Sequence, residues 1–172
     1  MGLLTFKGGI HPNDGKSLAK DKAIVEVLPE GDLVFPLSQH IGAPAAPIVK
    51  VGDQVLKGQK SAEAGGFVSA PVYSSVSGKV KAIAPYFTPT GGKVSSIIVE
   101  NDGAYTEAER LSTRPLEMLS KEEILNLIAE AGIVGMGGAG FPTRVKLSPK
   151  EPEKIEYVIA NCAECEPYIT AD

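Results

Sequence analysis

Four glycines fall within six residues near the end of the chain: Gly135, Gly137, Gly138 and Gly140. A backbone without side chains can approach a ligand closely, and successive amide N–H groups that point the same way form an anion-binding nest. Phosphate is the usual ligand of such a nest, and the downstream Lys146 can reach an anionic oxygen. These features indicate a phosphate-binding loop, and the alternative is a flexible glycine linker or a tight turn.

The same glycines satisfy the pattern G-x-G-x-x-G, which is weak evidence when it stands alone. A dinucleotide-binding loop of that kind follows a strand and opens a helix directly. Here the loop follows a predicted helix, and Pro142 interrupts what comes next. We therefore reject an ordinary Rossmann loop and expect Pro142 at the first position of a short helix.

A second polar segment combines an amide, two thiols and two carboxylates: Asn161, Cys162, Glu164, Cys165 and Glu166. The C-x-x-C spacing is typical of thiol–disulfide chemistry or of half a metal site. Negative neighbours disfavour the thiolate, and this chain lacks the further ligands of a four-cysteine cluster. The amide can donate and accept hydrogen bonds, and the carboxylates can accept them from sugar hydroxyls. Solvation of both glutamates is the alternative at this point.

The elements that must position these residues change in kind along the chain. Short β-type runs separated by turn residues predict a small sandwich or barrel, and they occupy residues 23–28, 33–37, 48–51, 55–56, 67–68, 80–83 and 94–100. Residues 120–131 predict a helix with a capping box of Ser120 and Glu123, and Gly132 takes the position after its end. The apolar run at residues 157–160 predicts a buried strand.

These patterns predict three parts: a β domain with an N-terminal arm (1–103), a linker (104–119) and the start of an α/β domain (120–172). One helix and one strand cannot bury a core, so we expect the chain to be the N-terminal piece of a longer polypeptide. The net charge of −4 argues against nucleic acid as a partner. No apolar run reaches the roughly 18 residues of a membrane span, and residues 1–12 contain no apolar stretch of the length found in signal peptides.

Residues 49–80 resemble the barrel-sandwich hybrid of biotinyl and lipoyl carrier domains, with VKVGDQVLKGQ followed by APVYSSVSGKV. In those families a lysine at a hairpin tip carries the cofactor. The corresponding stretch, residues 63–67, has no lysine, so we expect a structural or docking module. Lys57 and Lys60, in the preceding turn, are predicted to be solvated surface charges.

Longer segments carry a more specific resemblance. GMGGAGFPTRVKL (135–147) and YVIANCAECEPYITAD (157–172) are similar to the flavin-binding subunit of respiratory complex I, and more similar to the C subunit of the Rnf electron-transport complex. TFKGGIHP (5–12), PLSQHIGAPAAPIVKVGDQVLKGQ (36–59) and EAGGFVSAPVYSSVSGKVKAI (63–83) resemble the same Rnf protein. The implied fold is α+β, an all-β barrel-sandwich hybrid followed by the start of an α/β FMN- and NADH-binding domain.

The resemblance implies a peripheral subunit of an ion-translocating ferredoxin:NAD oxidoreductase complex, on the cytoplasmic side of the cell membrane. Such subunits bind FMN and NAD(H) and pass electrons to 4Fe-4S clusters, whose cysteines are expected downstream of this chain. The implied partners are other subunits of the membrane-bound complex, with ferredoxin reached indirectly. We expect this chain alone to be inactive.

The resemblance also implies a set of cofactor-binding residues: Gly135, Gly137, Gly138, Ala139, Gly140, Phe141, Thr143, Lys146, Asn161, Glu164 and Glu166. The glycine loop, Lys146, Asn161 and Glu164 would contact the flavin, and Glu166 the nicotinamide nucleotide. Complex I subunits have an aspartate where this chain has Ala163, so one polar flavin contact is missing, as it is in Rnf-like proteins. No catalytic side chain and no metal ligand are implied.

Two alternatives remain at the sequence level. The first is a non-enzymatic docking module of the hybrid-barrel type that binds no flavin. The second, ranked lower, is a thiol oxidoreductase built on Cys162 and Cys165.

Overall fold

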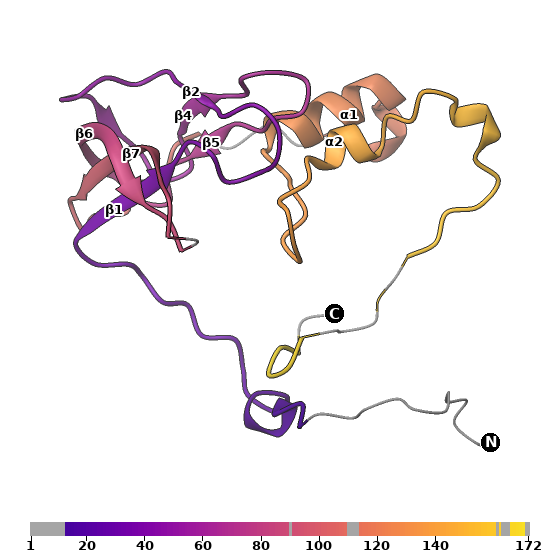
Figure 1. Cartoon of the computed structure of the whole chain (residues 1–172), viewed down its shortest axis with the longest axis horizontal. Coiled ribbons are helices and arrows are strands. Elements are labelled where there is room, and N and C mark those ends of the chain that lie inside the picture. Colours follow the sequence, from indigo (N-terminus) through magenta and orange to yellow (C-terminus); the bar gives the residue numbers. More distant parts are fainter. Residues whose placement is uncertain (1–12, 90, 110–113, 161, 163–165, 171–172) are drawn as a thin grey trace. The chain divides into compact units, whose positions relative to one another are not determined.

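Figure 1 shows the computed structural model of the chain, which describes residues 13–89, 91–109, 114–160, 162 and 166–170. Contacts divide it into two compact units. One unit combines Met1–Val27 with Glu153–Asp172, and the other is Leu28–Pro152.

The larger unit contains two antiparallel sheets. The first has four strands in the order β1 (Asp32–Pro36), β7 (Lys93–Asn101), β6 (Gly78–Phe87) and β3 (Gln54–Val55). The second has three strands in the order β2 (Ala46–Pro47), β4 (Lys60–Glu63) and β5 (Val72–Tyr73). Long β6 and β7 pair over nearly their whole length, with one register shift between Val80 and Ala82.

The core between these strands consists mostly of small and β-branched side chains, together with Phe35 and Leu37. Its most completely buried apolar members are Val55, Ala62, Val76, Val80, Ile97 and Val99. Five serines are buried with them, and the hydroxyls of four of these bond within four residues along the chain. The Ser77 hydroxyl instead donates to Asp102, 25 residues away, over 2.7 Å. This bond, with backbone amides that also donate to the carboxylate, lowers the pKa of Asp102.

The helical part of the larger unit agrees closely with the sequence pattern. Helix α1 (Lys121–Glu130) starts at Ser120, whose side chain accepts from the Glu123 amide while the Glu123 carboxylate accepts from the Ser120 amide. Gly132 has φ +66°, as expected after a helix end. The predicted helix and capping box are confirmed. The short helix α2 (Thr143–Lys146) follows, and Pro142 stands just before its first residue rather than at it.

Four of the predicted strands do not form. Residues 48–51 and 67–68 form turns, bends or irregular backbone, while β2, β4 and β5 form at positions with no strand signal. Residues 23–28 and 157–160 are extended and exposed, with Val158 94% exposed, so the predicted buried strand at 157–160 is wrong for this structure. Neither run pairs with a strand among the described residues, and unpaired backbone groups stay with water.

The remaining elements are single turns of 3-10 helix. They are η1 (Lys16–Leu18), η2 (Leu116–Met118) and η3 (Pro152–Lys154). No helix within the described residues is both long and apolar enough for a membrane span.

Candidate cofactor-binding site

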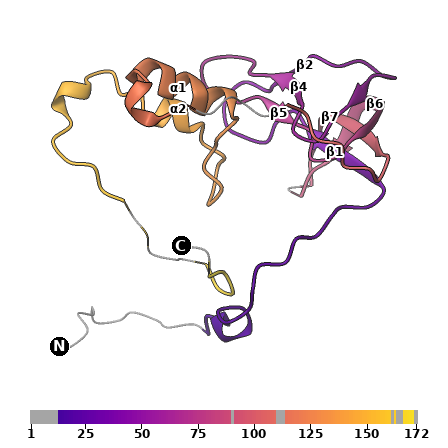
Figure 2. The same ribbon diagram turned by 180° about the vertical axis from the view of Figure 1, so that it is seen from behind.

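The predicted phosphate-binding loop is the tip of a narrow hairpin, residues 134–142, which we call the glycine hairpin. Val134 and Pro142 form an antiparallel bridge, and the Gly135 amide donates to the Phe141 carbonyl over 2.9 Å. At the base, the Thr143 amide donates to the Ile133 carbonyl over 3.0 Å. Figures 1 and 2 show this segment projecting from the helices that precede and follow it. The amides of Gly135 and Thr143 therefore serve the hairpin itself.

The tip of the glycine hairpin is open to solvent. Residues 135–139 are exposed, and a Cβ added to Gly137 or Gly138 would meet nothing within 4 Å. In the part of the chain that the structure describes, no hydrogen bond is donated by the amides of residues 136–140. The successive amides of the exposed residues 136–139 thus have the accessibility that an anion-binding nest needs.

Gly140 has a different role from the glycines at the tip. It is buried, its φ is +64°, and a Cβ there would lie 2.7 Å from the Gln39 carbonyl oxygen and 2.9 Å from the His40 Cα. The Ile41 amide donates to the Ala139 carbonyl over 3.1 Å. The absence of a side chain at residue 140 is required by packing of the hairpin against residues 39–41, whatever the loop binds.

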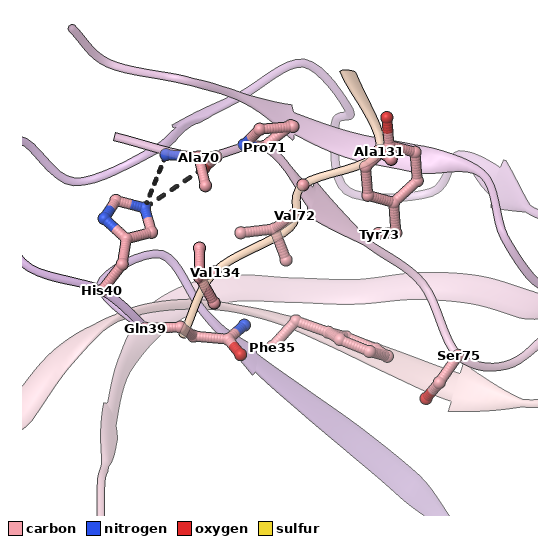
Figure 3. A pocket seen from close by; sticks show the side chains of 11 residues that line it. Phe35, Gln39, His40, Ala70, Pro71, Val72, Tyr73, Ser75, Ala131 and Val134 are labelled. Atoms are coloured by element: carbon pink, nitrogen blue, oxygen red, sulfur yellow. Dashed lines mark hydrogen bonds between the residues drawn. The ribbon is translucent and has the colours of Figure 1, made fainter. Parts of the chain in front are cut away.

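His40 organises the segment on which the hairpin rests. Its Nε2 lies 3.1 Å from the Ala70 amide nitrogen and 3.2 Å from the Ala70 carbonyl oxygen (Figure 3). Its Nδ1 lies 3.0 Å from the Ile41 carbonyl oxygen. Because the Ala70 N–H donates, Nε2 accepts, so the ring proton sits on Nδ1 and is donated to Ile41. From sequence alone this histidine is expected to be a surface or loop residue. Its partner, Ala70, is 30 residues away in the sequence, so the residues around His40 do not predict this hydrogen bond.

A hollow of about 450 Å³ lies beside His40. Figure 3 shows it bounded by strand residues of both sheets and by the chain that leaves α1. Its wall is mainly apolar, and the polar side chains that line it are those of Gln39, His40, Tyr73 and Ser75. The hollow is lined at one side by Val134, at the base of the glycine hairpin, and none of the exposed tip residues lines it.

Lys60 connects the β-sheets to α1. Its ammonium pairs with Glu63 at 3.2 Å and with Glu130, the last residue of α1, at shorter range. Burial opposes the charged form, but the hydrogen bonds to Glu130 and Glu63 outweigh it and raise the pKa of Lys60. The predicted solvated charge is therefore wrong for Lys60, whose side chain is 20% exposed.

The same connection is extended by Tyr73, whose hydroxyl donates to the Glu130 carbonyl. Lys57 pairs more loosely with Glu107, at 3.8 Å. Two residues of the carrier-like half, Lys60 and Tyr73, thus hold the end of α1, next to the chain that leads into the glycine hairpin.

The smaller unit contains the described part of the second polar segment. Lys16 Nζ donates to the Glu166 carbonyl over 3.1 Å and to the Ile169 carbonyl over 2.6 Å, and the Tyr168 amide donates to the Asp14 carbonyl over 2.6 Å. Cys162 is an exposed free thiol. Asn161, Glu164 and Cys165 lie outside the described residues, as does Ala163. No cluster of three or more His, Cys, Asp or Glu suited to a metal ion occurs among the residues described.

The structure thus brings one group of the predicted site residues together, in the larger unit. Gly135, Gly137, Gly138, Ala139, Gly140 and Phe141 lie in the glycine hairpin, with Gly140 buried at its foot. Thr143 is the first residue of α2, and Lys146, whose side chain is exposed, is the last. Glu166 belongs to the smaller unit. Their roles in cofactor binding stay predictions.

Comparison with known proteins defines the class of this chain. Residues 4–104 match the family model of the RnfC barrel-sandwich hybrid domain, and residues 128–172 match that of the Nuo51 FMN-binding domain. The first match covers more than half of the chain, so the chain belongs to the RnfC family. The predicted fold class, an all-β barrel-sandwich hybrid followed by the start of an FMN-binding domain, is confirmed.

Individual relatives have similar sequences throughout. The chain is 50% identical over 172 residues to the C subunit of the proton-translocating ferredoxin:NAD(+) oxidoreductase complex of Clostridium ljungdahlii, covering 99% of this chain and 37% of that protein. It is 45% identical over 171 residues to the C subunit of the Na(+)-translocating ferredoxin:NAD(+) oxidoreductase complex of Acetobacterium woodii, covering 98% of this chain and 38% of that protein. The resemblance to the C subunit of the Rnf complex is confirmed, and the chain spans well under half the length of these relatives.

Proposed function

We propose that this chain is the N-terminal part of a peripheral electron-transfer subunit of an ion-translocating ferredoxin:NAD oxidoreductase complex, on the cytoplasmic side of the membrane. Its share of the function is to hold FMN and NADH. The 4Fe-4S clusters that accept electrons belong to the part of the subunit outside this chain, and ferredoxin is reached through other subunits. When bound, FMN supplies hydride and single-electron chemistry.

The observation that carries the proposal is the glycine hairpin, because its tip has the donor groups that a flavin phosphate requires. Five successive amides at residues 136–140 are not used by other described groups, and two of them belong to glycines surrounded by open space. Backbone N–H groups bind phosphate through short hydrogen bonds without the cost of ordering side chains. The match to an FMN-binding family model spans the same residues.

The other residues have supporting roles in this proposal. Lys146, one turn of helix beyond the hairpin, offers an ammonium group to an anionic oxygen. Asn161 and Glu164 contact the flavin, and Glu166 accepts hydrogen bonds from the nicotinamide nucleotide. The hybrid barrel holds the hairpin base through residues 39–41, where Gly140 fits without a side chain.

The test is FMN titration of the complete subunit, followed by fluorescence quenching, with Gly138→Asp as the informative variant. A carboxylate at the hairpin tip repels the phosphate and occupies its place, so we expect FMN affinity to fall by at least about tenfold. Gly92→Asp is the matched control, because Gly92 is also exposed, with its nearest non-neighbour atom 4.0 Å from an added Cβ.

Equal FMN affinity in Gly138→Asp and the parent would remove the loop from the site. A complete subunit that binds no FMN at all would instead favour the non-enzymatic docking module. That alternative draws on one observation, the well-formed hybrid barrel without a carrier lysine at residues 63–67.

A further inference from the structure

The N-terminal arm, residues 13–27, does not belong with the β-sheets. Its contacts group it with Glu153–Asp172, the part of the chain that carries Glu166. The two contacting stretches are residues 13–16 and residues 166–169, about 150 positions apart, and we call the second the acidic turn.

Three interactions hold the acidic turn against the arm. The Lys16 ammonium bridges two carbonyl oxygens of the turn, those of Glu166 and Ile169. The Tyr168 amide donates to the Asp14 carbonyl. The Tyr168 ring lies on the backbone of Gly15, which is buried and leaves no room for a Cβ.

The arm is shaped locally for this contact. Asn13 Oδ1 accepts from the Gly15 amide at 3.1 Å, and Asp14 Oδ1 accepts from the Lys16 amide at 3.2 Å. These are side-chain turns of the kind that Asn and Asp favour, and they are followed by η1 at Lys16. Gly15 itself has φ +61°, a conformation that other residues rarely adopt. The turns formed by the sequence Asn-Asp-Gly-Lys therefore fix the backbone that carries the Lys16 side chain.

The acidic turn needs such support, because Tyr168 has φ +69°. A bulky residue in this left-handed region is strained by roughly 1 kcal/mol or more and keeps that shape only when its surroundings enforce it. Strained backbone of this kind clusters at ligand sites. Here the enforcing groups come from the arm, and Glu166 is the first residue of the turn that they fix.

We propose that Lys16 is a positioning residue for nicotinamide-nucleotide binding: by holding the Glu166 and Ile169 carbonyls, it fixes the direction in which the Glu166 carboxylate is presented to the nucleotide. This inference rests on the function proposed above. It extends the nucleotide site to an arm that precedes the hybrid barrel in sequence. Lys16 acts through Glu166 and does not itself contact the reacting atoms.

The test uses the complete subunit in its assembled complex, with NADH oxidation by ferricyanide as the assay and extracted flavin as the measure of FMN content. Lys16→Met removes the charge and keeps the length of the side chain. We expect the KM for NADH to rise about tenfold, because the charge-assisted hydrogen bonds to the turn are lost. The kcat and the FMN content should not change. Lys16→Arg, which keeps a cation with several donors, recovers most of the affinity.

Two further variants separate positioning from folding. Lys20→Met changes an exposed lysine of the same arm and should leave the KM unchanged. In a Glu166→Gln background, Lys16→Met should raise the KM for NADH little further. Both changes act on the contact between the Glu166 carboxylate and the nucleotide, which the Gln variant has already lost.

An unchanged KM in Lys16→Met, or a tenfold rise that persists in full in the Glu166→Gln background, would overturn the inference. So would loss of FMN in parallel with loss of NADH affinity, because that pattern indicates a general folding role. A parent subunit that binds no FMN and oxidises no NADH would instead overturn the proposed function, so the two failures are distinguishable.

Discussion

Gly140 at the foot of the glycine hairpin lies directly against the backbone of Gln39, in the segment that follows the first barrel strand. A Cβ at residue 140 would come within 2.7 Å of the Gln39 carbonyl oxygen. The hybrid barrel and the hairpin are therefore joined by backbone-to-backbone packing as well as by chain connectivity. The barrel, which has no carrier lysine, thus provides the surface against which the candidate phosphate loop packs.

The first prediction concerns the two kinds of glycine in the hairpin. Gly140→Ala introduces both a left-handed strain and a clash, so we expect a loss of roughly 1–3 kcal/mol in the free energy of unfolding. Gly137→Ala should change it by less than about 0.5 kcal/mol, because Gly137 is surrounded by open space. Urea unfolding of the two variants and the parent makes the comparison. Equal losses would show that Gly140 is not a packing glycine.

The second prediction concerns His40. Replacing it with alanine leaves the Ala70 amide without its acceptor, and an unsatisfied buried donor costs about 1–3 kcal/mol. His40→Gln retains an acceptor of similar reach and should lose less. The measurement is urea unfolding combined with hydrogen exchange at the Ala70 amide, which should exchange faster in His40→Ala. Unchanged exchange there would contradict the assigned tautomer and its hydrogen bond.

The third prediction concerns the connection between Lys60 and Glu130. Since both side chains are partly exposed to water, we expect a coupling free energy of at most about 1 kcal/mol in a double-mutant cycle of Lys60→Met and Glu130→Gln. The exposed pair of Lys81 and Asp32 is the control and should couple more weakly and lose its coupling in high salt.

The Lys60 interaction also has a defined pH dependence. Its pKa is raised in the folded state, so its contribution to stability is complete below the unfolded-state pKa of about 10.4 and is lost as pH rises through the folded-state value. A Lys60→Met variant should therefore lose this part of the alkaline destabilisation. Identical alkaline transitions in the variant and the parent would show that the pairing contributes nothing.

The fourth prediction concerns the capping box of α1. Hydrogen bonds from the Ser120 amide and hydroxyl, with the Arg114 guanidinium at 3.0 Å, lower the pKa of Glu123 to about 2. A carboxylate with a depressed folded-state pKa stabilises the fold above its unfolded-state pKa of about 4.3, and that contribution is lost as pH falls through about 2.

Circular dichroism of the helix between neutral pH and pH of about 2 measures this effect. Glu123→Gln should remove part of the acid-dependent loss of helix, whereas Glu122→Gln, on the neighbouring exposed residue without a capping bond, should keep it. Equal acid sensitivity of both variants would exclude the capping box as its source.

Much of the local structure is predictable from the sequence because its causes are local. Ser120, Glu123 and Gly132 define α1 through contacts within a few residues, and the short predicted runs at 80–83 and 94–100 lie within the longer strands β6 and β7. The lysine-free stretch at residues 63–67 and the glycine cluster at 135–140 are also recognised from the sequence alone. Propensity, capping and turn chemistry act over distances of one to four residues, so the sequence alone determines them.

Tertiary structure alone decides which of these pieces have partners. The runs at 23–28 and 157–160 have strand-like sequences, but a strand forms only where a neighbour accepts its hydrogen bonds, and none of the described strands does so. Conversely, Lys60, His40 and Gly140 look like surface or loop residues until Glu130, Ala70 and Gln39 are brought to them. Lys16 and Glu166 are the extreme case, because only the closing of about 150 residues of chain places an ammonium on those carbonyls.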